Sequence, residues 1–231
     1  MSIDVHIYGV HARDNMISEL ADALKLTGKF IHYDDRPNGG SPLYTCKKAW
    51  LSPVDAGITH RIVLQDDVAV CDDFLEIAAA IAETHPKAIV SFFPFQFQTT
   101  IPGIAECGTP YFLARPISGC GVMMPVEYIE PCFDYIRERY DDAVDDDQGM
   151  SFWANSNGVL ALTTIPALVQ HLGDVSVANP KAPVRRTPYF AQNPHANWKS
   201  TKIISWTEQE WFFSNHGKPR KDKGVIRVVE Y

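Results

Sequence analysis

The chain has 231 residues, of which 45% are hydrophobic and 11% aromatic. This length and apolar content are sufficient for one large domain with a proper core, and they exclude a mainly disordered chain. The formal net charge of −7 does not favour binding to nucleic acid through bulk charge. The charge is unevenly spread, however. Residues 1–180 contain 11 basic and 24 acidic residues, a charge of −13, whereas residues 181–231 contain 10 basic and 4 acidic residues, a charge of +6.

Three features predict a soluble, cytoplasmic protein. The first residues place Asp4 within an apolar run and include no basic segment, which is unlike a signal peptide. No window of the sequence reaches the roughly 18 consecutive apolar residues that a membrane helix needs. The five cysteines are odd in number and none of them forms a Cys-x-x-Cys pair. Reduced thiols are therefore favoured over a disulfide framework or a zinc knuckle.

Strand and helix patterns alternate through the first half of the chain. The predicted strands are 5–10, 29–33, 60–65 and 88–93, and the predicted helices are 14–26, 42–56 and 74–84. In the first helix Ile17, Leu20 and Leu24 recur at helical spacing, and Gly28 would follow as the residue that ends it. Asp73-x-x-Glu76 resembles a capping box at the start of the third helix. This order is typical of α/β units on a mostly parallel sheet flanked by helices.

The second half of the chain is less regular. Residues 94–118 are rich in aromatic residues, proline and glycine, as substrate-facing loops often are. A helix is predicted over 126–140, with Pro131 at its start or at a kink, then a helix near 147–155 and a strand near 159–164. Four prolines between 180 and 194 predict an extended tail. We therefore expect a domain over 1–178 and a basic, proline-rich extension over 179–231 that packs on it.

Two adjacent carboxylates, Asp66 and Asp67, directly follow the predicted buried strand 60–65. Open parallel sheets bind ligands at the carboxyl ends of their strands. Carboxylates gathered there repel one another unless a cation or the hydroxyls of a substrate engage them, and oxygen ligands suit Mg²⁺ or Mn²⁺. The alternative interpretation is that both side chains form a solvated turn.

Two further motifs carry groups with possible chemical roles. His171 stands just before a glycine and could supply a nitrogen ligand to the same ion, although a histidine there is also common as a structural or capping residue. Asp145, Asp146 and Asp147 precede a predicted helix. Acidic residues favour helix N-termini for capping and dipole reasons. Alternatively, crowding of like charges raises the pKa of one of them enough to make a general base.

In this order, the motifs resemble those of glycosyltransferases of the GT-A fold, most closely small bacterial, viral and lipopolysaccharide-type enzymes with a Leu-x-Asp-Asp-Val sequence. The resemblance spans about residues 3–176. It rests on the first strand with its glycine turn and on three segments, His-Arg-Ile-Val-Leu-Gln-Asp-Asp-Val at 60–68, Asp-Asp-x-x-Met at 146–150 and Pro-Ala-Leu-Val-Gln-His-Leu-Gly at 166–173. It implies a GT-A-like sheet with a donor half over about 1–93 and an acceptor half over about 94–178.

The resemblance also implies a reaction and a cofactor. A sugar would pass from a nucleotide sugar, with a UDP-sugar expected, to an acceptor hydroxyl. In the family, an Asp-x-Asp motif holds a divalent ion that bridges the diphosphate of the donor. Carried onto this chain, Asp67 and His171 become ligands of Mn²⁺ or Mg²⁺, and Asp66 contacts the ribose or a metal-bound water. Gln65 stands where the family has its first carboxylate; it can still bond a ribose but adds no charge.

Some of the remaining site residues follow from the same resemblance, whereas Arg185, Arg186 and Trp153 are proposed from their charge or their ring alone. The turn Gly9–Arg13, which includes His11, and the pair Asp34-Asp35 match positions that hold the nucleoside. Arg185 and Arg186 could fold over the phosphates as a lid, or form a solvated surface. Asp147, with Asp146 beside it, resembles the catalytic base of inverting members. Gly121, in the segment Gly119-Cys-Gly-Val122, is the acceptor contact that the resemblance implies, and Trp153, an aromatic residue on the helix after the base, is a further acceptor candidate.

The acceptor is left open between a saccharide and a modified base in viral DNA. The basic cluster over 218–223 supports the DNA acceptor, since it could contact a phosphate backbone. A viral protein of this kind would act in the cytoplasm of its host. One alternative function is a metal-dependent phosphodiesterase or nuclease built on Asp66, Asp67 and the 145–147 run, although such two-metal sites usually need more ligands. Another is a sugar- or nucleic-acid-binding module without catalysis, which would have no use for Asp147.

Overall fold

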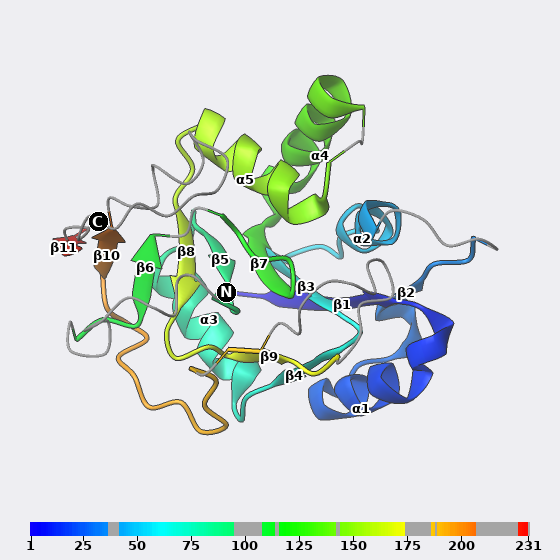
Figure 1. Cartoon of the computed structure of the whole chain (residues 1–231), viewed down its shortest axis with the longest axis horizontal. Coiled ribbons are helices and arrows are strands. Elements are labelled where there is room, and N and C mark those ends of the chain that lie inside the picture. The colour runs from blue at the N-terminus through cyan, green and yellow to red at the C-terminus, as the bar shows by residue number, and fades with distance from the viewer. Residues whose placement is uncertain are drawn as a thin grey trace.

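The computed structural model of the chain describes residues 1–36, 42–94, 108–113, 116–141, 144–173, 186–187, 189–206 and 226–230. Its elements in chain order (Figure 1) are β1 (Ile3–Gly9), η1 (His11–Arg13), α1 (Asp14–Leu24), η2 (Gly28–Phe30), β2 (Ile31–Tyr33), α2 (Pro42–Trp50), β3 (His60–Gln65), β4 (Val68–Val70), α3 (Phe74–Thr84), β5 (Ile89–Ser91), β6 (Tyr111–Leu113), β7 (Gly121–Pro125), α4 (Val126–Tyr140), α5 (Asp146–Ser156), β8 (Ala161–Thr164), β9 (Val169–His171), β10 (Lys202–Trp206) and β11 (Ile226–Glu230).

One large sheet runs through the molecule. Within the described ranges it has nine strands, in the order β11-β10-β6-β8-β5-β7-β3-β1-β2. β1 pairs in parallel with β2 and β3, β5 pairs in parallel with β8, and β7 lies antiparallel between β3 and β5. Taken together, the pairings give six of these nine strands one direction and three the other. The predicted α/β class with a mostly parallel sheet is confirmed.

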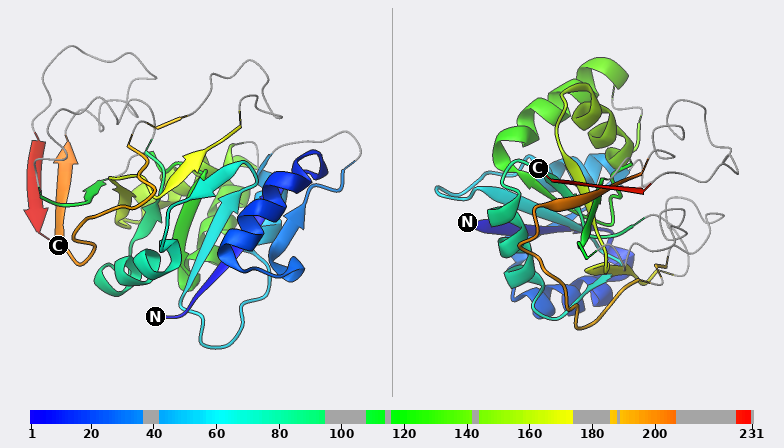
Figure 2. Two further views of the ribbon diagram at one scale, coloured as in Figure 1. Left: turned by 90° about the horizontal axis from the view of Figure 1, so that it is seen from below. Right: turned by 90° about the vertical axis from the view of Figure 1, so that its left-hand side faces the viewer.

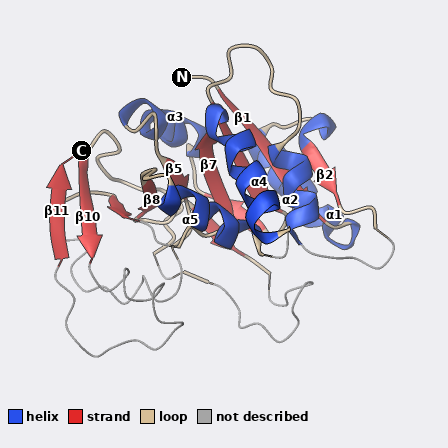
Figure 3. Ribbon diagram, turned by 90° about the horizontal axis from the view of Figure 1, so that it is seen from above, coloured by secondary structure: helices blue, strands red, loops and turns tan. Residues whose placement is uncertain are grey.

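Helices cover both faces of the sheet, and the end-on view in Figure 2 shows the resulting layers. Helices α2, α4 and α5 lie over one face, which is turned toward the viewer in Figure 3. Helices α1 and α3 and the small β4–β9 sheet cover the other face. Alternation along β3 explains this arrangement, since Ile62 and Leu64 belong to the core under α1 and α3, and Val63 belongs to the core under α2, α4 and α5. β3 is therefore buried on both faces.

The helix bounds match the predicted ranges where the spacing of apolar residues determines them. They differ where a helix end depends on the backbone conformation of one residue or on a proline. Helices α3 and α4 occupy their predicted ranges. Helix α1 ends earlier than predicted, because Lys25 rather than Gly28 adopts the left-handed conformation at its C-cap, with φ 55°. The capping box is wrong: Asp73 is also left-handed and its side chain makes no cap bond, whereas capping needs extended backbone. Helix α2 ends at Trp50, before Pro53, which lacks the N–H that a longer helix would use.

The predicted C-terminal extension contributes two strands, β10 and β11, to the large sheet. β10 runs beside β6, with Ile204 opposite Phe112, and β11 pairs with β10. Trp198 is buried, and its carbonyl oxygen accepts a hydrogen bond of 2.5 Å from the hydroxyl of Tyr111. The expectation of a wholly extended tail therefore differs from the structure, because the proline-rich stretch ends at Pro194 and the apolar strand β10 follows it. In the described part of the chain, no helix has both the length and the apolar character that crossing a bilayer requires.

Candidate functional site

The carboxyl ends of β1 and β3 bring the N-terminal turn against the acidic pair. The two strands are parallel, with Tyr8 opposite Gln65, so the residues that follow each strand meet at one edge of the sheet. A Cβ added to Gly9 would lie 2.2 Å from Cβ of Asp66. The backbone N–H of Val10 donates to Asp66 Oδ2 at 2.9 Å. Glycine is therefore needed at position 9 for Asp66 to sit over the end of β1.

Arg13, which precedes α1, contacts both carboxylates. Its Nη1 lies 2.7 Å from Asp66 Oδ1 and 2.6 Å from Asp67 Oδ2, and these acidic side chains are only 7% and 4% exposed. Burial raises the pKa of Asp66 above its ordinary value, and the charge of Asp67 adds to this, although the Val10 bond and Arg13 act in the opposite direction. Arg13 thus partly neutralises two buried charges that would otherwise repel each other.

His171 reaches the same pair from β9. This strand is antiparallel to β4, with His171 opposite Val68, and the N–H of Leu172 donates to the Asp67 carbonyl oxygen at 2.7 Å. The Nε2 atom of His171 lies 3.2 Å from Asp67 Oδ2. Burial alone would raise the pKa of Asp67, but the bond and charge of His171, together with Arg13, outweigh burial and hold this pKa below its ordinary value. The structure therefore brings together the two predicted metal ligands, which are about a hundred residues apart in sequence.

The chemistry of this donor pair fits one divalent ion. Two ligands at right angles, each bonded at about 2.1 Å, lie about 3 Å apart, close to the 3.2 Å between Asp67 Oδ2 and His171 Nε2. A Cβ at Gly173 would lie 2.5 Å from the same oxygen, so this glycine leaves room beside it. Among the described residues, no three His, Cys, Asp or Glu side chains are grouped to hold a metal. Two protein donors suit a single ion and disfavour the two-metal nuclease alternative.

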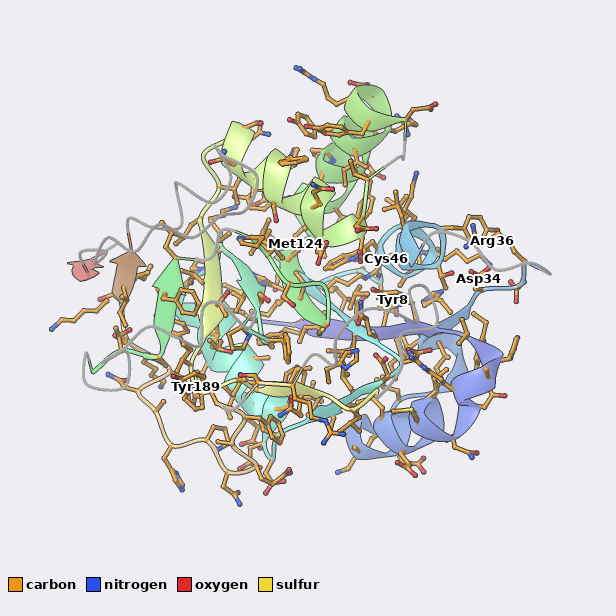
Figure 4. The ribbon with its side chains drawn as sticks, viewed as in Figure 1. Tyr8, Asp34, Arg36, Cys46, Met124 and Tyr189 are labelled. Carbon is orange, nitrogen blue, oxygen red and sulfur yellow. The ribbon has the colours of Figure 1, made fainter. Side chains whose placement is uncertain are left out.

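The predicted nucleoside residues after β2 are bound to basic side chains. Arg36 donates to Asp34 through Nε at 2.8 Å and through Nη2 at 2.6 Å, and these bonds lower the pKa of Asp34 to about 2. Figure 4 shows Asp34 and Arg36 side by side next to α2. Lys48 of α2 donates to Asp35 at 2.7 Å. The two carboxylates therefore belong to a cluster of charged side chains at the edge of the site.

An aromatic pair joins the N-terminal turn to the end of β2. The rings of His11 and Tyr33 are stacked, with centroids 4.1 Å apart and planes 8° from parallel. The His11 side chain is 62% exposed. The N–H of Asp34 donates to the Gly9 carbonyl oxygen at 3.0 Å, which holds the ends of β1 and β2 together. The geometry thus presents a stacked, accessible ring next to the acidic pair, and such rings accept other flat rings.

Asp146 points from the start of α5 into the interior. The hydroxyl of Tyr8 donates to Asp146 Oδ2 at 3.1 Å and accepts a bond from Gln65 Nε2 at 3.0 Å. The thiol of Cys46 on α2 also bonds to Asp146, and Figure 4 shows Tyr8 and Cys46 one above the other between β1 and α2. Burial raises the pKa of Asp146 despite these bonds. Asp146 is therefore enclosed by β1 and α2. Gln65, which was predicted to contact the ribose, donates its side-chain amide to Tyr8.

Asp147, by contrast, is only half-buried and lies over a glycine. A Cβ at Gly119 would lie 3.3 Å from Cβ of Asp147 and 3.4 Å from Asp146 Oδ2. The carbonyl oxygen of Cys120 accepts a bond of 3.2 Å from the N–H of Gln65. The start of α5 therefore lies over the segment that bonds to the end of β3, next to the strand end that carries the acidic pair.

The two predicted acceptor contacts face the core. A Cβ at Gly121 would lie 2.9 Å from Leu64 Cδ2 and 3.1 Å from Val169 Cγ2, so this glycine makes room for apolar packing. Trp153 is 6% exposed, and its ring lies 5.4 Å from that of Tyr128. Gly121 and Trp153 therefore pack in the core, and their role as acceptor contacts stays a prediction. Within the same glycine segment, Gly119 is the residue beside the carboxylates.

The basic residues predicted to cover the phosphates are described only in part. Arg185 and the cluster over 218–223 lie outside the described residues. Arg186 is exposed, and its neighbour Thr187 exchanges two bonds with the side chain of Gln170, at 2.9 and 3.0 Å. Gln170 precedes His171 on β9, so Arg186 lies on a segment fastened to the strand that carries His171.

Sequence reasoning missed Tyr8, Cys46 and Gly173 as members of the site. The sequence offered part of a signal for Tyr8, because His6 and Tyr8 alternate with Val5 and Ile7 along the predicted strand; the structure shows that this polar face is buried. Polar groups on a buried face must find hydrogen-bond partners. Nothing in the sequence around Cys46 or Gly173 indicated their neighbours.

Comparisons with known proteins give matches among solved structures alone, at low identity and low TM-score. No protein-family model matches the chain, and no curated protein sequence is significantly similar to it. Among solved structures, the chain is similar to a glycosyltransferase involved in the glycosylation of the major capsid of PBCV-1, with 11% identity, a TM-score of 0.41, and coverage of 77% of this chain and 96% of that one. It is also similar to the glycosyltransferase GlyE of Streptococcus pneumoniae TIGR4, with 10% identity, a TM-score of 0.42, and coverage of 80% and 58%. A third similar structure is protein A197 of STIV, with 10% identity, a TM-score of 0.44, and coverage of 85% and 100%. At such values, function has to be argued from the geometry of this chain.

Proposed function

We propose that this chain is a nucleotide-sugar-dependent glycosyltransferase, with a UDP-sugar as the expected donor. The observation that supports it most is the meeting of two groups of residues at one sheet edge. The first is the cluster of Arg13, Asp66, Asp67 and His171, and the second is the acidic start of α5. Glycosyl transfer needs positive charge where the diphosphate departs and a base where the acceptor hydroxyl arrives.

The donor binds, on this proposal, across the ends of β1, β2 and β3. The stacked rings of His11 and Tyr33 contact the nucleobase, and the turn after Gly9 approaches the ribose. Asp67 and His171 would hold Mn²⁺ or Mg²⁺, which when bound supplies positive charge for the departing diphosphate. Arg186, with Arg185 beside it in sequence, adds charge from the segment fastened to β9.

Asp147 is the proposed general base. It is half-buried in the first turn of α5, where a helix N-terminus favours a carboxylate. Asp147 takes the proton of the acceptor hydroxyl while the hydroxyl oxygen bonds to the anomeric carbon and the bond from that carbon to the diphosphate oxygen breaks. Asp146, buried against Tyr8, positions the turn that carries the base. The acceptor is proposed to be a hydroxyl of a saccharide or of a modified base in DNA.

A donor screen by mass spectrometry tests the proposal without knowledge of the acceptor. The full chain is incubated with a panel of nucleotide sugars, with and without Mn²⁺, and slow hydrolysis of one donor is expected. Nucleotide binding without turnover of any donor would indicate the binding-module alternative. If neither binding nor hydrolysis occurs for any member of the panel, the proposed function is wrong.

The base is tested by Asp147→Asn, with Asp145→Asn as the matched control. Asp145 is the exposed N-cap neighbour, and its side chain makes no capping bond. Because general-base catalysis contributes about 10²–10⁴-fold, Asp147→Asn should lose at least about a hundredfold in turnover while binding of the nucleotide, measured by calorimetry, stays unchanged. Full turnover by Asp147→Asn would remove Asp147 from the mechanism.

The DNA acceptor is tested separately by the salt dependence of binding. Contacts to a phosphate backbone release counterions, so affinity for DNA should fall steeply as salt rises. Absent or salt-independent binding leaves the saccharide as the acceptor.

A further inference from the structure

Arg13 lies where a cation would have to bind between the two buried carboxylates. A single nitrogen, Nη1, is 2.7 Å from Asp66 Oδ1 and 2.6 Å from Asp67 Oδ2. The Arg13 side chain is largely buried, and its backbone N–H donates to the Val10 carbonyl oxygen at 2.9 Å. The guanidinium is therefore held in the site by a short turn as well as by its ion pairs.

The shared atom is Asp67 Oδ2, which also faces His171. Nε2 of His171 lies 3.2 Å from it, and Nη1 of Arg13 lies 2.6 Å from it. An ion that binds Oδ2 together with His171 takes the position that faces His171, and it brings a second positive charge to the oxygen that the guanidinium contacts. Like charges at such a short distance repel each other. The ion and the guanidinium therefore oppose each other at Oδ2.

The charge in this part of the molecule indicates the same competition. Among the residues that the structure describes, Arg13 is the one lysine or arginine within 4.0 Å of Asp66 or Asp67. Two adjacent carboxylates buried with one permanent positive charge keep a net negative charge, and this charge attracts a second cation. Without Arg13, the pair would attract that cation more strongly.

We propose that Arg13 is the resident cation of this site, that it competes with a divalent ion for Asp67, and that binding of the ion releases the guanidinium toward the phosphate groups of the donor. The last part rests on the proposed function, whereas the competition at Asp67 does not. Arg13 is then a positioning residue that sets how tightly the protein binds metal in the absence of donor.

The test measures binding of Mn²⁺ alone to the full chain, by the electron paramagnetic resonance signal of the free ion. Arg13→Gln should bind Mn²⁺ about tenfold more tightly than the wild type, because a competing charge is removed. Adding Asp67→Asn to Arg13→Gln should abolish the gain. The control is Arg137→Gln, an exposed arginine on α4 paired with Asp134, which should leave Mn²⁺ affinity unchanged. Circular dichroism establishes that each variant is folded.

A second measurement uses the wild type, so that the inference is testable even if Arg13→Gln does not fold. Arginine side-chain nitrogen resonances are followed while Mg²⁺ is added, and the resonance of Arg13 should shift as the ion binds. A folded Arg13→Gln with Mn²⁺ affinity equal to or weaker than the wild type, including no measurable binding by either, overturns the inference. An Arg13 resonance that stays in place while Mg²⁺ binds also overturns it.

These outcomes are separable from those of the donor screen. If Arg13→Gln gains Mn²⁺ affinity but no nucleotide sugar binds or reacts, the competition stands and the proposed function fails. If a donor is hydrolysed but Arg13→Gln gains no affinity, glycosyl transfer stands and the role of Arg13 fails.

Discussion

Replacing Gly9 with alanine tests how closely the end of β1 fits against the acidic pair. The added Cβ would lie 2.2 Å from Cβ of Asp66 and 2.4 Å from its Oδ2, whereas ordinary van der Waals contact begins at 3.4 Å. The strand end and the Asp66 side chain must therefore separate by about 1 Å. A displacement of that size breaks at least one of the bonds that Asp66 accepts from Val10 and Arg13.

The expected cost has two parts. Overpacking a well-packed position costs about 1–3 kcal/mol, and a lost hydrogen bond to a charged group costs about 1.5–3 kcal/mol. Gly9→Ala should therefore lower the free energy of unfolding by about 2.5–6 kcal/mol. For a chain of this size, each kcal/mol lowers the melting temperature by about 2–4 °C, so the expected fall lies between about 5 and 24 °C.

The assay is urea unfolding followed by circular dichroism, with Gly28→Ala as the matched control. A Cβ at Gly28 would meet nothing within 4 Å, so Gly28→Ala should change the free energy of unfolding by no more than about 0.5 kcal/mol. Calorimetry with UDP should show weaker nucleotide binding for Gly9→Ala than for the wild type, whereas Gly28→Ala should bind UDP as the wild type does. Equal unfolding free energies for the two variants would refute the close fit between Gly9 and Asp66.

Two further predictions concern the polar network at the other end of β1. Arg61 is fully buried and donates to Asp4 at 2.6 Å. Arg61→Met should cost about 3–5 kcal/mol in urea unfolding because it removes the permanent positive charge paired with a buried carboxylate, whereas Arg137→Met, at an exposed pair, should cost less than about 1 kcal/mol. Burial, with the charges of His6 and Arg61, lowers the pKa of His32 to about 4 from 6.5. The folded state therefore favours neutral His32, and its contribution to stability is full above pH 6.5 and is lost as the pH falls from 6.5 toward 4. His32→Gln should flatten this dependence in unfolding measured across that range, and an unchanged slope would contradict the assignment.

The sequence was sufficient for features that local patterning determines. The alternation of Ile62, Val63 and Leu64 between two cores follows from the period of a strand, and it predicts a central position for β3. Parallel strands place their carboxyl ends at one edge, which is why the turn after Gly9 and the pair Asp66-Asp67 could be expected to meet. The meeting of Asp67 and His171 came instead from a family resemblance, since no local period connects residues a hundred positions apart.

The orientations of individual side chains could not be predicted in the same way. Asp145, Asp146 and Asp147 are equivalent in sequence, yet only Asp146 points inward, because α5 begins where Tyr8 of β1 can reach it. Gly121 and its neighbour Gly119 were likewise indistinguishable. One makes room for Leu64 in the core and the other lies beside the carboxylates. Both differences depend on which elements pack together, and that information is not local.

Gln65 links the end of β3 to the acidic start of α5, and an amide fits this position, where the glycosyltransferases that the sequence resembles have a carboxylate. A phenolic hydroxyl has one hydrogen to donate. Because the Gln65 amide donates to Tyr8 at 3.0 Å, the hydrogen of Tyr8 remains available for Asp146, which accepts it at 3.1 Å. An ionised carboxylate at position 65 can only accept a bond, so it would compete with buried Asp146 for that one hydrogen and add a like charge nearby. The amide therefore suits this chain because it sends both hydrogen bonds in one direction, from β3 through β1 to the start of α5.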